Sequence, residues 1–148
     1  MLKRWLILAS LLGAALGASL LAAPPAAHAE EQRYAIRASM EEMEVNSRGT
    51  LTLEVEAVGG FAIDAAYPAA LSVLPEVGDE VLVAQKQKYE RRDAKLSKDG
   101  KTLSWAVSFT GRRAGKHPVK LNAKFRVCKD DECHEEEASL RLTVVVKG

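Results

Sequence analysis

Apolar and polar residues alternate with a period of two along almost the whole chain after residue 33, and this restricts the fold more than any other feature. The alternation is nearly strict in 50–58 and recurs in 34–40, 102–110 and 116–128. Successive side chains of a strand point to opposite faces, so this period indicates strands with one buried face. No part of the chain after residue 33 sustains a helical period. The sequence therefore predicts an all-β domain.

Glycine and proline residues divide this region into about seven or eight short strands. Further strands are predicted at 61–63, 71–74 and 81–84. The Asp-Gly turn of 98–101 tolerates positive φ angles, so 89–97 is predicted to pair with 102–110. Such a set of short antiparallel strands is typical of an immunoglobulin-like β-sandwich. A small β-barrel is the alternative, because a period of two does not separate these two architectures.

The same alternation predicts which residues form the core. One face of each of the last three strands is apolar; these residues are Leu103, Trp105, Val107 and Phe109, then Val119, Leu121, Ala123, Phe125 and Val127, then Leu140, Leu142, Val144 and Val146. We expect these faces to be buried between two layers.

The first 29 residues have the pattern of a secretory signal peptide. Lys3 and Arg4 precede an apolar run, and Ala27-His28-Ala29 provides a small-x-small cleavage site. An uncleaved membrane anchor is the alternative, but Pro24-Pro25 just before the site favours cleavage. We therefore expect a signal peptide at 1–29 and a single domain at 30–148, without a membrane span, in the periplasm or outside the cell.

Charge and motifs exclude several functions. Removing Lys3 and Arg4 leaves 19 basic residues against 20 acidic ones, and this near-neutral balance argues against nucleic acid as a partner. No Ser/His/Asp arrangement, phosphate-binding loop or catalytic carboxylate pair stands out, so hydrolase chemistry has no support. No cofactor is predicted.

Cys128 and Cys133 are the only cysteines, and in an exported protein such a pair usually forms a disulfide. If Cys128 lies opposite Cys133, residue numbers of opposed positions in the last two strands sum to 261. Apolar residues then face apolar residues, as in Leu121 with Leu140, while Lys124 and Arg126 face glutamates on the outer side. The sequence therefore predicts a disulfide on the outer face of the last hairpin. Glu136 would then point inward opposite Phe125, so the hairpin tip is expected to project beyond the core.

The use of this disulfide is left open by the residues around it. A bond that closes a loop of about six residues stabilises a fold by roughly 2 kcal/mol, which is a weak structural reason for its position. Six acidic residues, partly offset by Lys129 and His134, surround the pair; they are Asp130, Asp131, Glu132, Glu135, Glu136 and Glu137. Carboxylates disfavour a thiolate, so the pair is expected to attack slowly and to be a weak oxidant.

Metal binding is a third alternative, in which Cys128, Cys133, His134 and His117 would supply soft ligands. The spacing is not that of a usual zinc site, and the acidic run lacks the ligand spacing of a calcium loop. We predict no metal site. His117 is expected at the surface, and His134 is expected to pack at the hairpin tip.

The segment from 34 to 146 resembles the N-terminal periplasmic domain of the DsbD family of thiol:disulfide interchange proteins. The resemblance rests on Tyr67-Pro68, on Ala114-Gly115 before the cysteine strand, and on the segment 127–133. It implies an immunoglobulin-like sandwich whose Cys128 and Cys133 exchange with periplasmic partners. It also implies an aromatic shield over the pair, for which Phe61 or Tyr67 is available. Here four residues separate the cysteines, whereas the family usually has five, and its transmembrane and thioredoxin-like parts are absent.

Two functions follow as hypotheses. The first is an accessory thiol-disulfide exchange protein with a thioredoxin-like or other envelope protein as partner, in which His134, Phe61 and Tyr67 support the cysteines. The second is a non-catalytic secreted interaction module whose disulfide is purely structural. Enzyme activity other than thiol-disulfide exchange is not expected.

Overall fold

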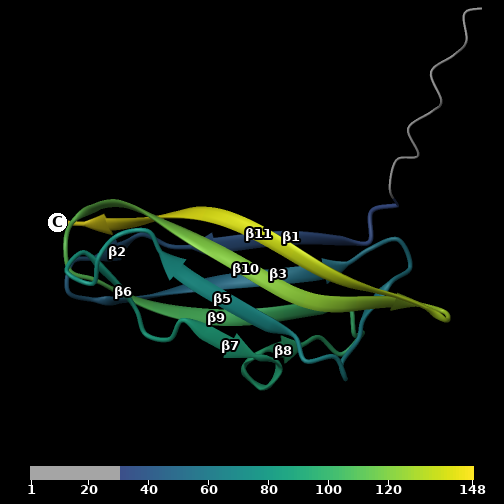
Figure 1. Cartoon of the computed structure of the whole chain (residues 1–148). Coiled ribbons are helices and arrows are strands. Elements are labelled where there is room, and N and C mark those ends of the chain that lie inside the picture. Colours follow the sequence, from purple (N-terminus) through teal and green to yellow (C-terminus); the bar gives the residue numbers. More distant parts are fainter. Residues whose placement is uncertain (1–30) are drawn as a thin grey trace, which may run out of the picture. The chain divides into compact units, whose positions relative to one another are not determined.

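Two β-sheets face each other across an apolar core in residues 31–148, the part of the chain that the computed structural model describes (Figure 1). The predicted signal peptide lies outside these residues. The strands are β1 (Tyr34–Met40), β2 (Met43–Glu44), β3 (Arg48–Ala57), β4 (Ala62–Ile63), β5 (Ala70–Pro75), β6 (Leu82–Ala84), β7 (Lys88–Glu90), β8 (Lys95–Leu96), β9 (Thr102–Gly111), β10 (Gly115–Lys129) and β11 (Glu132–Lys147). One 3-10 turn, η1 (Arg91–Asp93), lies between β7 and β8.

The first sheet has the order β1-β3-β9-β6, and β8 also pairs with β9. The second sheet has the order β2-β11-β10-β5-β7, and β4 also pairs with β10. All pairings are antiparallel except that of β2 with β11, which is parallel. The chain therefore changes sheet between β1 and β2, so that its second strand, β2, pairs with its last, β11.

The distribution of the long strands defines the fold. Taken in chain order, β1, β3 and β9 belong to one sheet and β5, β10 and β11 to the other. This is the A-B-E against C-F-G arrangement of immunoglobulin domains. No strand pairing within residues 31–148 joins the two sheets, which excludes the barrel. The fold is an immunoglobulin-like β-sandwich, as the sequence predicts.

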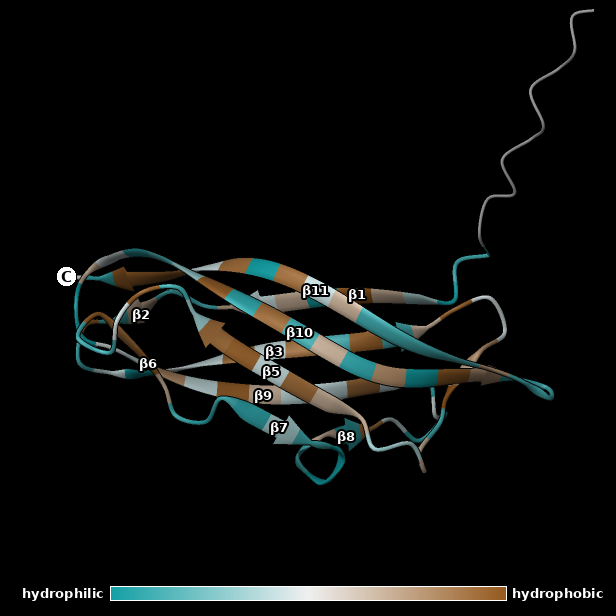
Figure 2. Ribbon diagram, in the orientation of Figure 1, coloured by the Kyte–Doolittle hydropathy of each residue, from teal (hydrophilic) through white to brown (hydrophobic). Residues whose placement is uncertain are grey.

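The predicted core is confirmed. The inward residues of β9 and of β10 from Val119 to Val127 are at most 1% exposed, and Val144 and Val146 of β11 are also buried. Leu140 and Leu142 are partly buried against the core. Figure 2 shows apolar and polar bands alternating along β10 and β11 up to a polar hairpin tip.

The predicted register of the last hairpin is confirmed over its full length. All fifteen opposed pairs of β10 and β11, from Gly115↔Val146 to Lys129↔Glu132, have numbers that sum to 261. The parity of apolar residues fixes this register, because a slip by one residue would expose the whole inward set.

The predicted pairing of 89–97 with 102–110 is wrong for most of its length. Only Lys95 and Leu96 pair with β9, whereas Tyr89 lies in β7 and pairs with Leu71 of the other sheet. The turn η1 produces this change of sheet, and the Asp93 carboxylate accepts a hydrogen bond from the Glu90 amide at 2.7 Å. The indole of Trp105 donates to the Glu90 carbonyl at 3.1 Å and so anchors the crossing to the core.

The strand count also differs from the predicted seven or eight. Eleven strands occur within residues 31–148, and five of them have only two or three residues. Of these short strands, β4 and β6 match the strands predicted at 61–63 and 81–84, β2 is not predicted, and β7 and β8 correspond to the single strand predicted near 89–97. A strand of two residues leaves too little periodic sequence to be recognised. The same residues contain no helix with the length and apolar character needed to cross a membrane.

Candidate functional site: the hairpin disulfide

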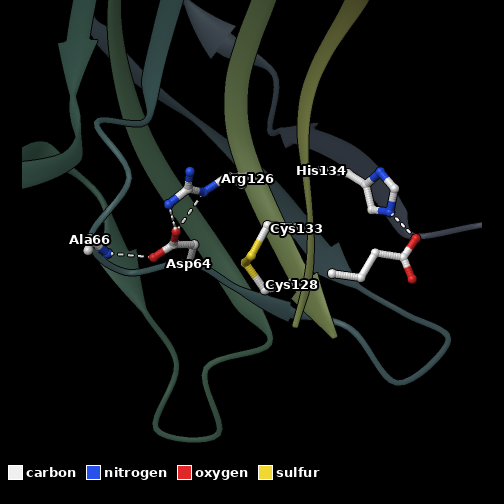
Figure 3. Close-up of a disulfide and its surroundings, with 7 residues drawn as sticks. Asp64, Ala66, Arg126, Cys128, Cys133 and His134 are labelled. Atoms are coloured by element: carbon white, nitrogen blue, oxygen red, sulfur yellow. Dashed lines mark hydrogen bonds and ion pairs between the residues drawn. A yellow bond between two sulfur atoms is a disulfide. The ribbon is translucent and has the colours of Figure 1, made fainter. Parts of the chain in front are cut away.

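Cys128 and Cys133 form a disulfide at the end of the β10–β11 hairpin, and their Cα atoms are 4.1 Å apart (Figure 3). They are directly opposed, as the register predicts. Asp130 and Asp131 make the two-residue turn beyond them, and Asp130 has a φ angle of 54°. Aspartate tolerates this left-handed conformation better than most residues, so the local sequence suits a tight turn.

The backbone of β10 shows which way each residue of the hairpin faces. The carbonyl groups of Pro118 and Arg126, two even-numbered residues, accept hydrogen bonds from Glu76 and Asp64, on the side away from β11. The even residues of β10 therefore form non-hydrogen-bonded pairs with β11, which fits the short Cα separation of the cysteines. It follows that the N–H and C=O groups of Cys133 point away from β10.

The two cysteines have different surroundings. Cys128 is partly buried, because it lies between Cys133 on one side and Ala62 of β4 on the other. Cys133 is exposed. Within residues 31–148, β2 is the only strand on the far side of β11, and it pairs only with Val146 and Lys147 at the opposite end. Cys133 is thus the more accessible residue of the two.

Basic side chains near the disulfide are engaged by carboxylates. The Arg126 guanidinium donates to Asp64 with an Nε–Oδ2 distance of 2.7 Å, and the Asp64 amide donates back to the Arg126 carbonyl at 2.8 Å. This guanidinium, assisted by the Ala66 amide, holds the pKa of Asp64 below its ordinary value of 3.8. Lys129 pairs with Glu31 at 3.3 Å. Because both side chains are paired with carboxylates, Arg126 and Lys129 stabilise a cysteine thiolate less than unpaired cations would.

The inward Glu136 does not push the hairpin tip beyond the core, contrary to the expectation from sequence. Its carboxylate accepts a hydrogen bond from Arg33 at 2.5 Å, and its side chain is only 12% exposed. Phe125 and Val127 are fully buried. The ion pair neutralises the inward charge, so the core continues to the last pair before the disulfide.

The three supporting residues proposed from sequence gather around β10 in different ways. Phe61 is buried with its ring edge-on to His134, at a centroid distance of 5.9 Å. The nitrogen Nε2 of His134 lies 2.5 Å from a carboxylate oxygen of Glu132. The ring of Tyr67 lies under the Arg126 guanidinium at 5.3 Å. Phe61 therefore supports the hairpin from the core side, and Tyr67 supports it through Arg126.

His117 is buried, with 7% of its surface exposed, whereas the sequence predicts a surface residue. Its Nε2 donates to the Arg113 carbonyl at 2.7 Å, because the chain folds back at 113–116 over the ring. Eleven residues of extended strand, about 36 Å, separate it from Cys128. The four soft ligands considered for a metal are therefore not brought together.

The sequence predicts a strand at 61–63, but it does not predict that this segment supports the cysteine strand. The segment 58–64 pairs with β10 at Val127 and Cys128, and the Ile63 amide donates to the Gly100 carbonyl of the first sheet at 2.8 Å. Gly59 and Gly60 have φ angles of 66° and 84°, which permits the reversal before β4. The Gly-Gly pair signals the turn, but nothing in the sequence shows its destination.

A hollow lies at the opposite end of the sandwich from the disulfide, where the chain passes from β1 to β2. Its volume is about 790 Å³, and its lining includes Met40, Met43 and three glutamates. Both methionine side chains converge on Gly49 of β3, where an added Cβ would lie 2.7 Å from Met40 Cε. The hollow is far from the disulfide and is closed on its inner side by methionine packing.

No protein-family model matches this chain, and no curated protein matches it. Fifteen solved chains resemble it in fold, and three of them illustrate the likeness. They are AggA, the major subunit of aggregative adherence fimbriae type I from Escherichia coli (9% identity, TM-score 0.41, 78% of this chain and 97% of that one), a conjugative transposon lipoprotein from Bacteroides eggerthii (10%, 0.37, 73% and 96%), and a PapD-like domain of human CEP192 (14%, 0.38, 97% and 96%). The functional argument therefore depends on the disulfide itself.

Proposed function

We propose that the domain is an exported accessory protein of thiol-disulfide exchange, in which Cys128 and Cys133 alternate between disulfide and dithiol. The proposal agrees with the resemblance to the N-terminal domain of the DsbD family. The observation that carries it is the exposed Cys133 at the end of a hairpin strand whose outer side is unpaired. The sulfur of a partner cysteine can approach Sγ of Cys133 without any opening of the core.

The position of the bond supports exchange over stapling. Fifteen residue pairs already hold β10 to β11, and the bond closes only the last turn. Its contribution to the free energy of unfolding is therefore small, about 2 kcal/mol. A disulfide between the two sheets would constrain the unfolded chain far more.

The exchange needs a dithiol donor of the thioredoxin-like class. A donor thiolate attacks Sγ of Cys133, the bond to Cys128 breaks, and Cys128 leaves with the electron pair and takes a proton from water. The second donor thiolate then attacks the donor sulfur of the mixed disulfide and releases Cys133. The donor is oxidised by two electrons, and the pair in this domain is reduced by two.

The acidic surroundings favour onward transfer once the pair is reduced. Asp130, Asp131 and Glu135 make no ion pair within residues 31–148. Carboxylates disfavour the thiolates, so the reduced pair is not stabilised and the equilibrium favours electron transfer to a more oxidising disulfide, although the attack itself is slow.

The same carboxylates are the observation in favour of a second function, an interaction module with a structural disulfide. They slow the attack of either cysteine at neutral pH. The two functions differ in whether the native disulfide is reduced by a protein donor.

The deciding experiment measures reduction of the native protein by a thioredoxin-like donor. Thiol alkylation followed by mass spectrometry reports reduction, and tryptophan fluorescence reports folding in the same sample. We expect full reduction while the domain stays folded. Reduction that occurs only in denaturant, in step with unfolding, would overturn exchange and leave the structural disulfide.

Two single variants test the order of the steps. Cys128→Ser leaves the exposed thiol, and Cys133→Ser leaves the partly buried one. We expect the thiol of Cys128→Ser to attack the disulfide of the oxidised donor, the reverse of the release step above, and to form the mixed disulfide about tenfold faster than Cys133→Ser, because exchange rates depend on access to the sulfur. The second donor sulfur leaves as a thiolate. Equal rates would contradict the assignment of Cys133 as the attacked atom.

A further inference from the structure

The outer edge of β11 beside the disulfide is a row of unpaired backbone groups. Cys133, Glu135 and Glu137 have their N–H and C=O groups on the side away from β10, by the parity described above. Within residues 31–148, no strand pairs with them on that side. All three residues are exposed. Such an edge is a template for an added strand.

The position of Cys133 on this edge is suited to sulfur chemistry. A residue paired with Cys133 through both backbone groups would have its Cα about 5.5 Å away, with its side chain on the same outer face. That separation lies within the usual range for a disulfide. An added strand would therefore present its own side chain to the Cys133 sulfur at bonding distance.

The negative charge of this edge favours an added strand with basic side chains. Glu135 and Glu137 share the outer face with Cys133, and Asp131 lies in the turn just before this strand. Glu137 accepts a hydrogen bond from Asn122, while Glu135 and Asp131 have no ion pair in this part of the chain. Lys or Arg on either side of the attacking residue would face these carboxylates across the pair.

We propose that the exchange partner docks through an extended, basic segment that adds to β11 as a further strand and places its cysteine opposite Cys133. This inference rests on the proposed exchange function for its redox step, but the docking itself needs no redox step. The occupant is a protein segment with Lys or Arg two residues before and after its cysteine.

A blocked heptapeptide, Thr-Lys-Thr-Cys-Thr-Lys-Thr, serves as the probe, because its symmetry suits either strand direction. A peptide with glutamate in place of lysine is its matched control, and serine in place of cysteine gives a non-reactive version of each. Reaction of the cysteine peptide with the oxidised domain is followed by mass spectrometry. Backbone amide shifts report binding of the serine peptide.

Two variants at one position separate backbone pairing from charge. Glu135→Gln keeps the outward N–H and removes the carboxylate. Glu135→Pro removes both, and it costs no hydrogen bond to β10, because this N–H points to the open edge. Ser139→Pro makes the same backbone change four residues further along β11, six residues from Cys133, and is the positional control. Dithiothreitol, which needs no docking, measures the intrinsic reactivity of every variant.

We expect the lysine peptide to react faster than the glutamate peptide, and Glu135→Pro to react about fivefold more slowly than Glu135→Gln, the usual effect of one lost hydrogen bond. Ser139→Pro should react with the lysine peptide at the rate of the unmodified domain. The rate of reduction by dithiothreitol should be the same for every variant. The serine peptide should shift the amides of Cys133, Glu135 and Glu137.

Equal rates for Glu135→Pro and Glu135→Gln, or no amide shifts at the three edge residues, would overturn the docking proposal. The failure of exchange has a different signature. In that case the amide shifts appear, but neither dithiothreitol nor the cysteine peptide reduces the folded domain.

Discussion

At the level of single residues, the disulfide is supported by partners that lie far from it in the chain. Asp64 and Arg126 are 62 residues apart, and Arg33 and Glu136 are 103 apart. The parity of β10 places Arg126 on the outer face with Cys128, but the sequence gives no sign that Asp64 returns to meet it. Long-range side-chain partners of this kind depend on loop paths, which period and charge do not encode.

The ion pair of Asp64 gives a pH-dependent prediction. Its folded pKa is lowered, chiefly by the hydrogen bond from Arg126, so its stabilising effect is present above pH 3.8 and is lost as the pH falls through the folded value. Asp64→Asn should lower the free energy of unfolding by about 1 kcal/mol at pH 7. Urea unfolding should show the two proteins converging at low pH.

The control for that measurement is Asp79→Asn, a substitution at an exposed residue. Its free energy of unfolding should differ from that of the unmodified domain by nearly zero, both at pH 7 and at low pH. A gap for Asp64→Asn that persists unchanged at low pH would mean that the charge is not responsible.

His117 gives a second prediction at this scale. Its ring is buried and donates to the Arg113 carbonyl, so His117→Ala leaves both a void and an unsatisfied carbonyl. We expect a loss of about 1–3 kcal/mol in the free energy of unfolding, measured by urea denaturation. Lys116→Ala, at the exposed neighbour, should change it by less than about 0.5 kcal/mol. Similar small effects for both variants would show that the ring is not a structural anchor.

At the level of elements, the β10–β11 hairpin was the most predictable part of the molecule. Its apolar parity and its cross-strand charges point to one register, so the place of the disulfide follows from sequence alone. The segment 89–97 behaves differently. Tyr89 has the inward position that the period of two predicts, but it lies before the turn η1 and pairs with Leu71 of the other sheet. A period of two defines which face of a strand is buried, but it does not define the neighbouring strand.

The hairpin also sets the cost of losing its disulfide. With fifteen pairs and buried Val127 in place, the double variant Cys128→Ser, Cys133→Ser should stay folded and lose roughly 2 kcal/mol of unfolding free energy. Thermal and urea unfolding measure the loss, and the chemically reduced wild type is the control. An unfolded double variant would mean that the bond is required for the fold, which would strengthen the structural alternative.

At the level of the whole molecule, the two sheets approach each other closely where Gly111 of β9 faces Val146 of β11. A Cβ at Gly111 would lie 2.6 Å from a methyl carbon of Val146. The alternation predicts that Val146 faces inward, but the closeness of the two sheets at this point depends on the packing of the whole core.

Gly111→Ala should therefore lower the free energy of unfolding by about 1–3 kcal/mol through overpacking. In a double-mutant cycle, Val146→Ala should recover part of this loss, with a coupling energy of about 1 kcal/mol. Urea unfolding of the four proteins gives the cycle. Additive losses would show that the two residues do not press on each other.

The placement of the two ends of the domain has a mechanical consequence. Glu31 contacts Lys129 at the disulfide end, while Gly148 lies beside Ala114 at the other end. Tension applied between these residues would pull β1 and β11 along their own axes, in opposite directions. The hydrogen bonds of β1 with β3 and of β11 with β10 would then be loaded in shear, all at the same time. They would not break in sequence from one end of the strand.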